Sequence, residues 1–399
     1  LSLHLSSLFN AFDSLILFPT ALLSPKMMGH LRSPSSMSHR SGRRRWNCAY
    51  LVLTVIITLV FFVAVIPLPK DYQDPRDAFI HDVTEHIPQS IRPAVNINAA
   101  QLSKTASKHA YATFLASSAG EQDDENISQD KYFVATRILA YQILHAPETR
   151  TRSKIPFIVL VNQGVSEAKR ERLRRDGAII WEAEPVDPKW ITTSISTWQA
   201  VLTKLRLWEL TQFERICFLD GDTVLTRSID DVFDDPAVST KQTGTKESAI
   251  REDEAQQPRQ YVFAGVPEMM TVQVKRDLAA IDLADSVLSL GFFVFEPSVE
   301  LLAYYISLTE TPGRFEPELP EQNLLNYAHR PQGNMPWIHL DTKWNMHYPS
   351  VQDLEGGVAT LHEKWWEPVY TDLGPYLESW RWRMEGFYEA RDLFMKWRD

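Results

Sequence analysis

Two spacings of apolar residues alternate along the middle of the chain. Three short and almost continuous apolar runs have the length and composition of buried strands: 111–116, 155–161 and 178–183. Two segments between them have the pattern of helices, an apolar face over 130–146 and a charged segment over 166–177 that ends in glycine. Strands that alternate with helices in this way predict an α/β fold with a mostly parallel sheet.

The pattern continues with a helix over 201–212 and a strand over 215–222 that ends in two carboxylates. Ligands of such sheets collect at the carboxyl ends of strands, where Asp220 and Asp222 stand. Two carboxylates on either side of a flexible glycine can bind a hard divalent cation and leave positions open for phosphate. An EF-hand loop does not fit, because Leu225 occupies the sixth position, where that loop needs glycine. A solvated acidic turn is the alternative.

The N-terminal part has the pattern of a membrane anchor. The run over 48–66 carries no charge and is long enough for a helix that crosses about 30 Å of hydrocarbon. Arginines precede it, which predicts a cytosolic tail over 1–46, a transmembrane signal-anchor helix over 47–66 and a lumenal remainder. A cleaved signal peptide is the alternative. Residues 1–36 are interpreted as a gene-model artefact, with Met37 as the true start.

The remaining segments differ in composition. Residues 67–108 are rich in proline and polar residues, which is typical of a stem or linker before a domain over 109–399. Residues 236–259 lack aromatic residues and are predicted to form a flexible insertion. Asn126 begins a glycosylation sequon. Residues 374–399 have a helical pattern, and their tryptophans are predicted to pack against the domain.

Composition excludes several classes of protein. The chain has 399 residues, of which 44% are hydrophobic and 23% charged, so it is neither wholly disordered nor a multi-span transporter. The formal charge of -10 argues against non-specific binding to nucleic acid. Two cysteines cannot form a disulfide framework.

The segment 201–233 resembles the core of glycosyltransferase family 8, especially its glycogenin-like and fungal membrane-anchored branch. The resemblance runs from about residue 111 to about residue 364, and the further matching motifs are GFFVFEPSVE, EQNLLN, KWN and LHEKWW. It implies a GT-A type nucleotide-diphospho-sugar transferase domain, with a Rossmann-like, mostly parallel sheet. It also implies transfer of a sugar from a UDP-sugar with retention of anomeric configuration, using Mn²⁺ or another divalent cation.

The resemblance assigns metal ligands. Asp220 and Asp222 match the family's Asp-x-Asp motif, and His362 matches its late metal-ligand histidine. A neutral imidazole suits manganese beside carboxylates. Glycogenins tend to have alanine where this chain has Gly221, a change that we expect to be tolerated. Without the resemblance, the histidine would be interpreted as an ordinary core or surface residue.

The resemblance also assigns donor contacts. Lys204 matches a lysine that reaches the donor, and Lys364 matches one that contacts phosphate, although the motif after His362 is shorter than in the family. Tyr132 matches a tyrosine near the uracil ring. Exposed lysines and ordinary helix packing of the tyrosine are the alternatives.

Other matching positions depart from the family pattern. Glu321 and Gln322 match an Asp-Gln pair near the reacting carbon, where a carboxylate can stabilise positive charge or act as a nucleophile. Ser289 and Gly291 stand where the family often has Asn-small-Gly around a donor-sugar contact. Asn345 matches an asparagine near the acceptor side.

These assignments predict a metal-dependent retaining glycosyltransferase. It is expected to transfer a hexose or N-acetylhexosamine from a UDP-sugar to a glycan or glycoconjugate acceptor, as a type II Golgi membrane protein. Two alternatives remain. The altered motifs are compatible with a non-catalytic protein that binds nucleotide-sugar or glycan. A glycogenin-like, self-glucosylating primer fits poorly with a membrane anchor.

Overall fold

The computed structural model describes residues 106–117, 127–193, 196–268 and 286–398. The predicted cytosolic tail, the transmembrane helix, most of the stem and the Asn126 sequon lie outside these residues. Within the described ranges, no helix has the length and apolar composition needed to cross a membrane.

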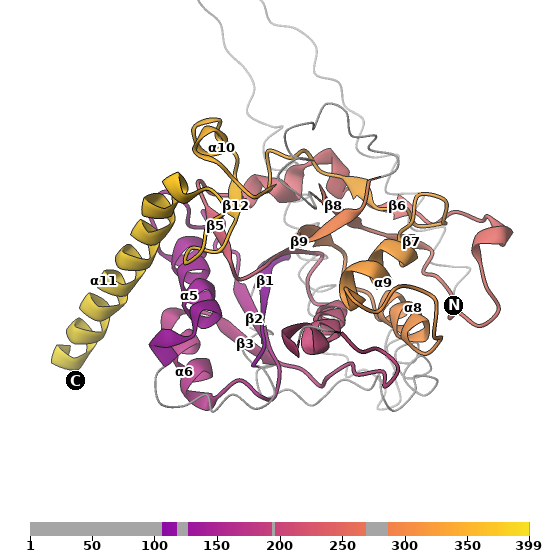
Figure 1. Ribbon diagram of the computed structural model, residues 1–399, viewed down its shortest axis with the longest axis horizontal. Helices are drawn as coiled ribbons and strands as arrows, with labels where there is room; N and C mark the ends of the chain where they lie inside the picture. The colour runs from indigo at the N-terminus through magenta and orange to yellow at the C-terminus, as the bar shows by residue number, and fades with distance from the viewer. Residues whose placement is uncertain (1–105, 118–126, 194–195, 269–285, 399) are drawn as a thin grey trace, which may run out of the picture. The chain divides into compact units, whose positions relative to one another are not determined.

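A seven-stranded sheet forms the centre of the domain (Figure 1). Its strands lie in the order β10 (Ile338–His339), β8 (Phe263–Pro267), β9 (Leu288–Phe295), β4 (Arg215–Leu219), β1 (His109–Leu115), β2 (Phe157–Val161) and β3 (Ile179–Glu182). All neighbours are parallel except at β9, which runs antiparallel to both β4 and β8. The predicted α/β fold with a mostly parallel sheet is confirmed.

Helices cover both faces of the sheet. On one face lie α5 (Lys131–Leu144) and α6 (Glu167–Asp176), and on the other lie α8 (Val299–Thr309), α9 (Pro320–Ala328) and the 3-10 helix Ser196–Glu209. Side chains of a strand alternate between these faces, so that Phe218 packs into one core and Cys217 into the other. The strands predicted at 111–116, 155–161, 178–183 and 215–222 are therefore confirmed, although the last one ends at Leu219, and the helices predicted at 130–146 and 166–177 are confirmed as well. The segment expected as a helix at 201–212 is 3-10 helix up to Glu209, and 210–212 follow its end.

Local sequence explains where these helices begin and end. The Asp130 carboxylate accepts hydrogen bonds from the backbone amides of Tyr132 and Phe133, which caps α5. Gly177 ends α6 with φ of 106°, a left-handed conformation that favours glycine. Short 3-10 turns occur at Ile127–Gln129, Asp230–Asp234, Pro236–Val238, Glu247–Ala249 and Thr371–Leu373.

A small second sheet lies beside the end of β4. It has the order β11 (Met346–His347), β12 (Thr360–His362) and β5 (Thr223–Leu225), with the helix α10 (Val351–Glu355) between β11 and β12. The antiparallel pairing of β12 with β5 sets His362 opposite Thr223. Gln142 of α5 holds β5 in place, because its amide donates to the Leu225 carbonyl and accepts from the Leu225 amide.

The segment 236–259 is attached to α8 and α9 by polar contacts. The two-residue strand β6 (Lys241–Gln242) near its start pairs with β7 (Gln260–Tyr261), which directly follows it. The Glu254 carboxylate accepts hydrogen bonds from Tyr304 at 3.2 Å and from Tyr327 at 2.6 Å. Polar residues of the segment 236–259 thus make specific contacts with the rest of the domain.

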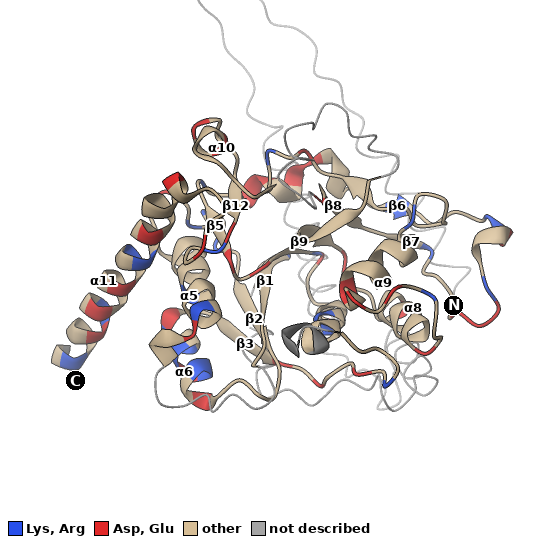
Figure 2. Cartoon of the chain, viewed as in Figure 1, with Lys and Arg blue, Asp and Glu red and all other residues tan. Residues whose placement is uncertain are grey.

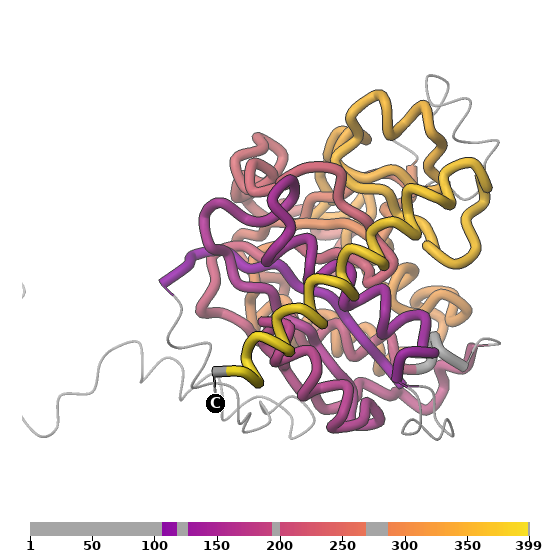
Figure 3. The backbone as a smooth tube through the Cα atoms, turned by 90° about the vertical axis from the view of Figure 1, so that its left-hand side faces the viewer, coloured from indigo at the N-terminus to yellow at the C-terminus, as the bar shows by residue number. Residues whose placement is uncertain are grey.

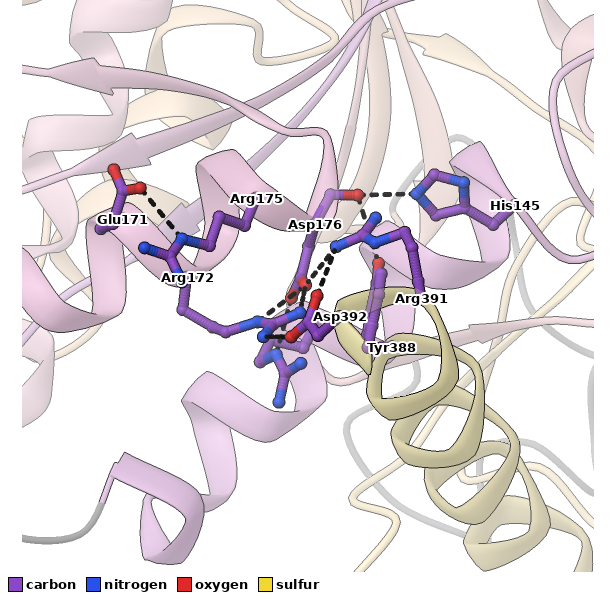
Figure 4. A network of polar contacts seen from close by, with 9 residues as sticks. His145, Glu171, Arg172, Arg175, Asp176, Tyr388, Arg391 and Asp392 are labelled. Atoms are coloured by element: carbon purple, nitrogen blue, oxygen red, sulfur yellow. Dashed lines mark hydrogen bonds and ion pairs between the residues drawn. The ribbon is translucent and has the colours of Figure 1, made fainter. Parts of the chain in front are cut away.

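The long helix α11 (Gly374–Arg398) crosses the outside of the domain and packs on α5 (Figures 1 and 3). Its Trp380 is buried in a cluster with Leu377, Met384 and Tyr388, as predicted for packing, whereas Trp382 is 58% exposed. Figure 4 shows a charged network that connects α11 to α6. We call it the Asp176 network, and it consists of Asp176, Arg137, Arg172, Arg391 and Asp392.

Candidate active site

Three predicted metal ligands lie together at the carboxyl end of β4. One ligand atom from each of Asp220, Asp222 and His362 lies within 4.8 Å of the others. The His362 Nε2 atom is 3.8 Å from Asp220 Oδ2 and 3.3 Å from Asp222 Oδ1. Two carboxylates and an imidazole fit manganese or a similar divalent cation, because each presents a donor atom to the same point. The group remains partly accessible, with the side chains of the three residues 31%, 14% and 13% exposed.

Two glycines make room for this arrangement. A Cβ atom at Gly291 would overlap the His362 ring and would lie 3.4 Å from Asp220 Oδ2. The Gly291 carbonyl also accepts a hydrogen bond of 2.9 Å from the Asp220 amide. At Gly221 a Cβ atom would lie 3.0 Å from the Thr136 hydroxyl, which is a tight contact. The threonine on α5 therefore favours glycine at this position.

Lys204 joins the metal-ligand cluster to α9. Its Nζ atom lies 3.0 Å from Asp220 Oδ1 and 3.0 Å from Glu321 Oε2. Lys204 and Glu321 are both buried, and the other Glu321 oxygen, Oε1, has no hydrogen-bond partner among the described residues. A buried carboxylate oxygen without a partner is costly, so this atom is a candidate contact for a ligand.

The electrostatics of the site depend on burial and on paired charges. Burial opposes the charged form of His362, but its hydrogen bond to Asp222 and the charges of Asp222, Asp220 and Glu268 raise its pKa to about 9. Burial also raises the pKa of Glu321 to about 7, although the Lys204 charge acts in the opposite direction. The pKa of Lys204 is raised, because its two carboxylate partners outweigh the effect of burial.

Sequence reasoning missed three residues near His362. His347 on β11 stacks on His362, with ring centroids 4.7 Å apart, and its Nδ1 atom lies 3.0 Å from Glu268 Oε1. Tyr348 stacks on His347 with ring centroids 4.0 Å apart and has a positive φ of 52°. Glu268 directly follows β8, so the rule that identified Asp220 at the end of β4 could have found it. No comparable sequence pattern points to His347.

Ser289 and Asn345 lie in the wall around this group. Ser289 is buried on β9 beside the Glu268 carboxylate, and its hydroxyl accepts a hydrogen bond of 3.5 Å from the Gly291 amide. Asn345 is buried, and its Oδ1 atom accepts a hydrogen bond of 2.8 Å from the Thr360 hydroxyl. Asn345 therefore connects the segment before β11 to β12, and its side-chain amide nitrogen has no partner among the described residues.

Aromatic and basic side chains border the metal-ligand cluster. Tyr132 is 47% exposed, has the Lys364 charge beside its hydroxyl, and meets Trp366 edge to face with ring centroids 5.0 Å apart. The Thr136 hydroxyl donates to the Tyr132 carbonyl and lies 3.0 Å from where a Cβ atom of Gly221 would stand, so the backbone of Tyr132 lies near the cluster. Lys364 is exposed, as a residue that binds an incoming phosphate would be.

Gln322 is the site residue with the weakest connection to this group. It is partly buried on α9, next to Glu321, and its backbone carbonyl accepts a hydrogen bond of 2.8 Å from Asn326. The described structure thus brings ten predicted residues into one region or its wall: Tyr132, Lys204, Asp220, Asp222, Ser289, Gly291, Glu321, Asn345, His362 and Lys364. Such a region can hold a cation, an anionic group and a flat ring side by side.

Comparisons with known proteins identify relatives. No family model matches the chain. The uncharacterized protein C4C3.09 of Schizosaccharomyces pombe is 30% identical over 275 residues, which are 63% of this chain and 72% of that protein. The chain belongs to the same family as C4C3.09. Galactinol synthase 10 of Arabidopsis thaliana is 25% identical over 290 residues, which are 66% of this chain and 80% of the synthase.

The similarity to galactinol synthases supports the prediction of glycosyltransferase family 8, whereas the membrane-anchored branch remains a prediction. Among solved structures, the galactosyltransferase LgtC in complex with donor and acceptor sugar analogues is 15% identical. The match covers 70% of this chain and 95% of that structure, with a TM-score of 0.42.

Proposed function

We propose that this protein is a metal-dependent retaining glycosyltransferase that uses a UDP-sugar donor. The observation that carries the proposal is the convergence of Asp220, Asp222 and His362 at the carboxyl end of β4, with the Lys204 and Glu321 pair beside them. The similarity to galactinol synthases supports a glycosyltransferase on independent grounds. The retaining outcome and the UDP-sugar come from the motif resemblance.

The residues of the site suit the departure of a nucleoside diphosphate. A divalent cation held by Asp220, Asp222 and His362 would act as a Lewis acid toward the diphosphate. Lys364, exposed beside Tyr132, supplies a positive charge that can follow the phosphates. Lys204 holds Asp220 in place and neutralises charge between the two carboxylates, so we assign it a positioning role.

Glu321 suits a contact with the transferred sugar. Its Oε1 atom is buried without a hydrogen-bond partner among the described residues, while its Oε2 atom is fixed by Lys204. A fixed carboxylate beside a reacting sugar carbon can stabilise positive charge or attack that carbon. Tyr132 offers an aromatic face to the base. Ser289 and Glu268 form the wall in which we expect selection among hexose and N-acetylhexosamine donors.

The first test is UDP release from a panel of UDP-sugars with Mn²⁺. We expect turnover of one donor by the wild type, and a loss of at least about 100-fold in the Asp220→Ala, Asp222→Ala double variant. Asp231→Ala is the matched control, because this aspartate is 61% exposed and pairs with Arg227. Manganese-dependent UDP binding without turnover, also after a screen of glycan acceptors, would favour a non-catalytic nucleotide-sugar binding protein. Absence of both in folded protein would refute the proposed site.

We also propose that the domain faces the lumen of the Golgi, anchored by the apolar segment 48–66. The support is the uncharged length of this segment and the arginines before it. Digestion of intact vesicles with protease tests the orientation: the domain should be protected until detergent is added. A domain cleaved in intact vesicles would contradict it.

A further inference from the structure

The outward face of α11 carries an apolar stripe. We call it the outer stripe, and it consists of Trp382, Gly386, Ala390, Leu393 and Trp397. These residues recur at intervals of three or four and therefore lie on one face of the helix. Trp382, Leu393 and Trp397 are 58%, 57% and 88% exposed, and Phe394 beside them is 62% exposed.

The opposite face of α11 already packs on the domain, through Leu377, Trp380, Met384 and Tyr388. Figure 3 shows α11 lying along the outside of the described chain. A helix with apolar residues on two opposite faces is typically packed against other structure on both of these faces. The exposed side chains of the outer stripe therefore indicate a surface that binds another molecule.

Small residues occupy the middle of the outer stripe and large ones its C-terminal end. Glycine inside a helix costs about 1 kcal/mol relative to alanine. A Cβ atom at Gly386 would meet nothing within 4 Å, so no described neighbour requires glycine there. Gly386 and Ala390 are instead two small residues on the exposed face of α11, one helical turn apart.

One register lets the outer stripe pack against itself. If two copies of α11 lie antiparallel with Ala390 opposite Leu393 of the other copy, Gly386 lies opposite Trp397 of the other copy, because the two pairs are four residues apart in the sequence. Leu393 then meets Ala390 and Trp397 meets Gly386, and the two-fold symmetry of the pair makes each contact occur twice. Large residues set against small ones allow helices to approach closely and interdigitate.

Charge supports the same register. Glu389 and Lys396 are both exposed, seven residues apart, and flank the outer stripe on one side. In the antiparallel register, Lys396 of one copy lies within side-chain reach of Glu389 of the other. Acidic and basic side chains alternate along α11 (Figure 2), so the helix lacks the strong positive charge that favours an anionic membrane.

We propose that a second copy of this chain docks on the outer stripe from Gly386 to Trp397, through an antiparallel pairing of the two α11 helices. The interface is isologous, with Leu393 and Trp397 of each copy as its anchors. It lies away from the proposed active site and does not depend on the proposed function.

Sedimentation of the full-length chain in mild detergent tests the proposal. We expect a dimer at micromolar concentration and a dissociation constant at least tenfold higher for Leu393→Glu. Glu378→Lys is the matched control, because its position on α11 falls outside the overlap of the paired helices, and it should leave the dimer unchanged. Circular dichroism checks that each variant is folded. A folded monomer at about 100 μM, or a dimer that Leu393→Glu leaves intact, would overturn the proposal.

A charge exchange tests the antiparallel register. Glu389→Lys alone and Lys396→Glu alone should each weaken the dimer, because each brings like charges together. Mixing the two variants should restore a heterodimer, since each lysine then meets a glutamate. Failure of the mixture to associate would refute the antiparallel register. With the full-length chain reconstituted in vesicles and no dimer in the wild type, faster protease cleavage within α11 in Leu393→Glu than in the wild type would identify the outer stripe as a membrane contact instead.

Discussion

At the scale of single residues, the lack of a side chain at Gly291 determines whether the metal ligands can converge. A Cβ atom there would overlap the Cε1 and Nδ1 atoms of His362. We expect Gly291→Ala to displace the imidazole and to weaken Mn²⁺ binding at least tenfold, measured by isothermal titration calorimetry. Gly374→Ala is the control, because its added Cβ would make an ordinary contact of 3.6 Å with Pro368. Unchanged Mn²⁺ affinity in Gly291→Ala would argue against His362 as a ligand.

A second residue, His329, makes stability depend on pH. It is fully buried between the Tyr305 hydroxyl and the Met335 carbonyl, both at 2.6 Å. Burial lowers its pKa to about 3, from 6.5 in an unfolded chain. The unfolded chain therefore takes up a proton below pH 6.5 while the folded one does not, so this contribution is complete above pH 6.5 and is lost as the pH falls.

We expect this loss to reach about 2 kcal/mol at pH 5. Urea unfolding at pH 7.5 and pH 5 measures it. The decrease in the free energy of unfolding between these conditions should be smaller by that amount in His329→Gln than in the wild type. Equal decreases would show that His329 is protonated in the folded protein.

Single residues also show how far the sequence could predict the site. Asp220 and Asp222 could be found because they end a buried strand, and His362 because of its motif. His347 reaches the site only through the pairing of β11 with β12, which no local pattern encodes. The coupling of Lys204 to both Asp220 and Glu321 likewise depends on how α9 packs against the 3-10 helix.

At the scale of elements, the Asp176 network fastens α11 to α6. Asp176 is fully buried and lies 2.7 Å from Arg137 Nε and 2.5 Å from Arg172 Nη2. The Asp176 backbone carbonyl also contacts His145 and Tyr388 (Figure 4). A buried carboxylate among guanidinium groups is costly to remove, because the cations then lose their partner.

We expect Asp176→Asn to lower the free energy of unfolding by about 3–5 kcal/mol and to increase protease cleavage within α11. Denaturant unfolding and limited proteolysis measure the two effects. Asp392→Asn is the matched control: its side chain is 35% exposed, so we expect a loss of about 1 kcal/mol or less. Similar losses in the two variants would contradict a central role for Asp176.

The elements that periodicity predicted were those with local signals. β2 has a continuous apolar run, and α6 has a serine cap and a terminal glycine. The antiparallel direction of β9 and its place between β8 and β4 follow from tertiary packing, so the order of the sheet could not be predicted. The same applies to the 3-10 geometry of Ser196–Glu209.

At the scale of the whole molecule, metal binding should stabilise the folded domain. A ligand at one hundred times its dissociation constant adds about 2.7 kcal/mol, which corresponds to a rise of roughly 5 °C or more in the melting temperature. We expect this shift with Mn²⁺ in differential scanning fluorimetry, and a smaller one with Ca²⁺, which prefers oxygen ligands. Asp222→Asn should lose the shift and Asp231→Asn should keep it. An equal shift in Asp222→Asn would mean that Mn²⁺ binds elsewhere.

The pairing of β12 with β5 also has a consequence for synthesis. Asp220 and Asp222 leave the ribosome long before His362, which is presented by a strand near the end of the chain. The parallel strands from β1 to β4 can therefore assemble cotranslationally while the metal site still lacks one of its three ligands. Completion of the site thus requires that the chain has been made and folded through β12, so chains that terminate before β12 cannot display it.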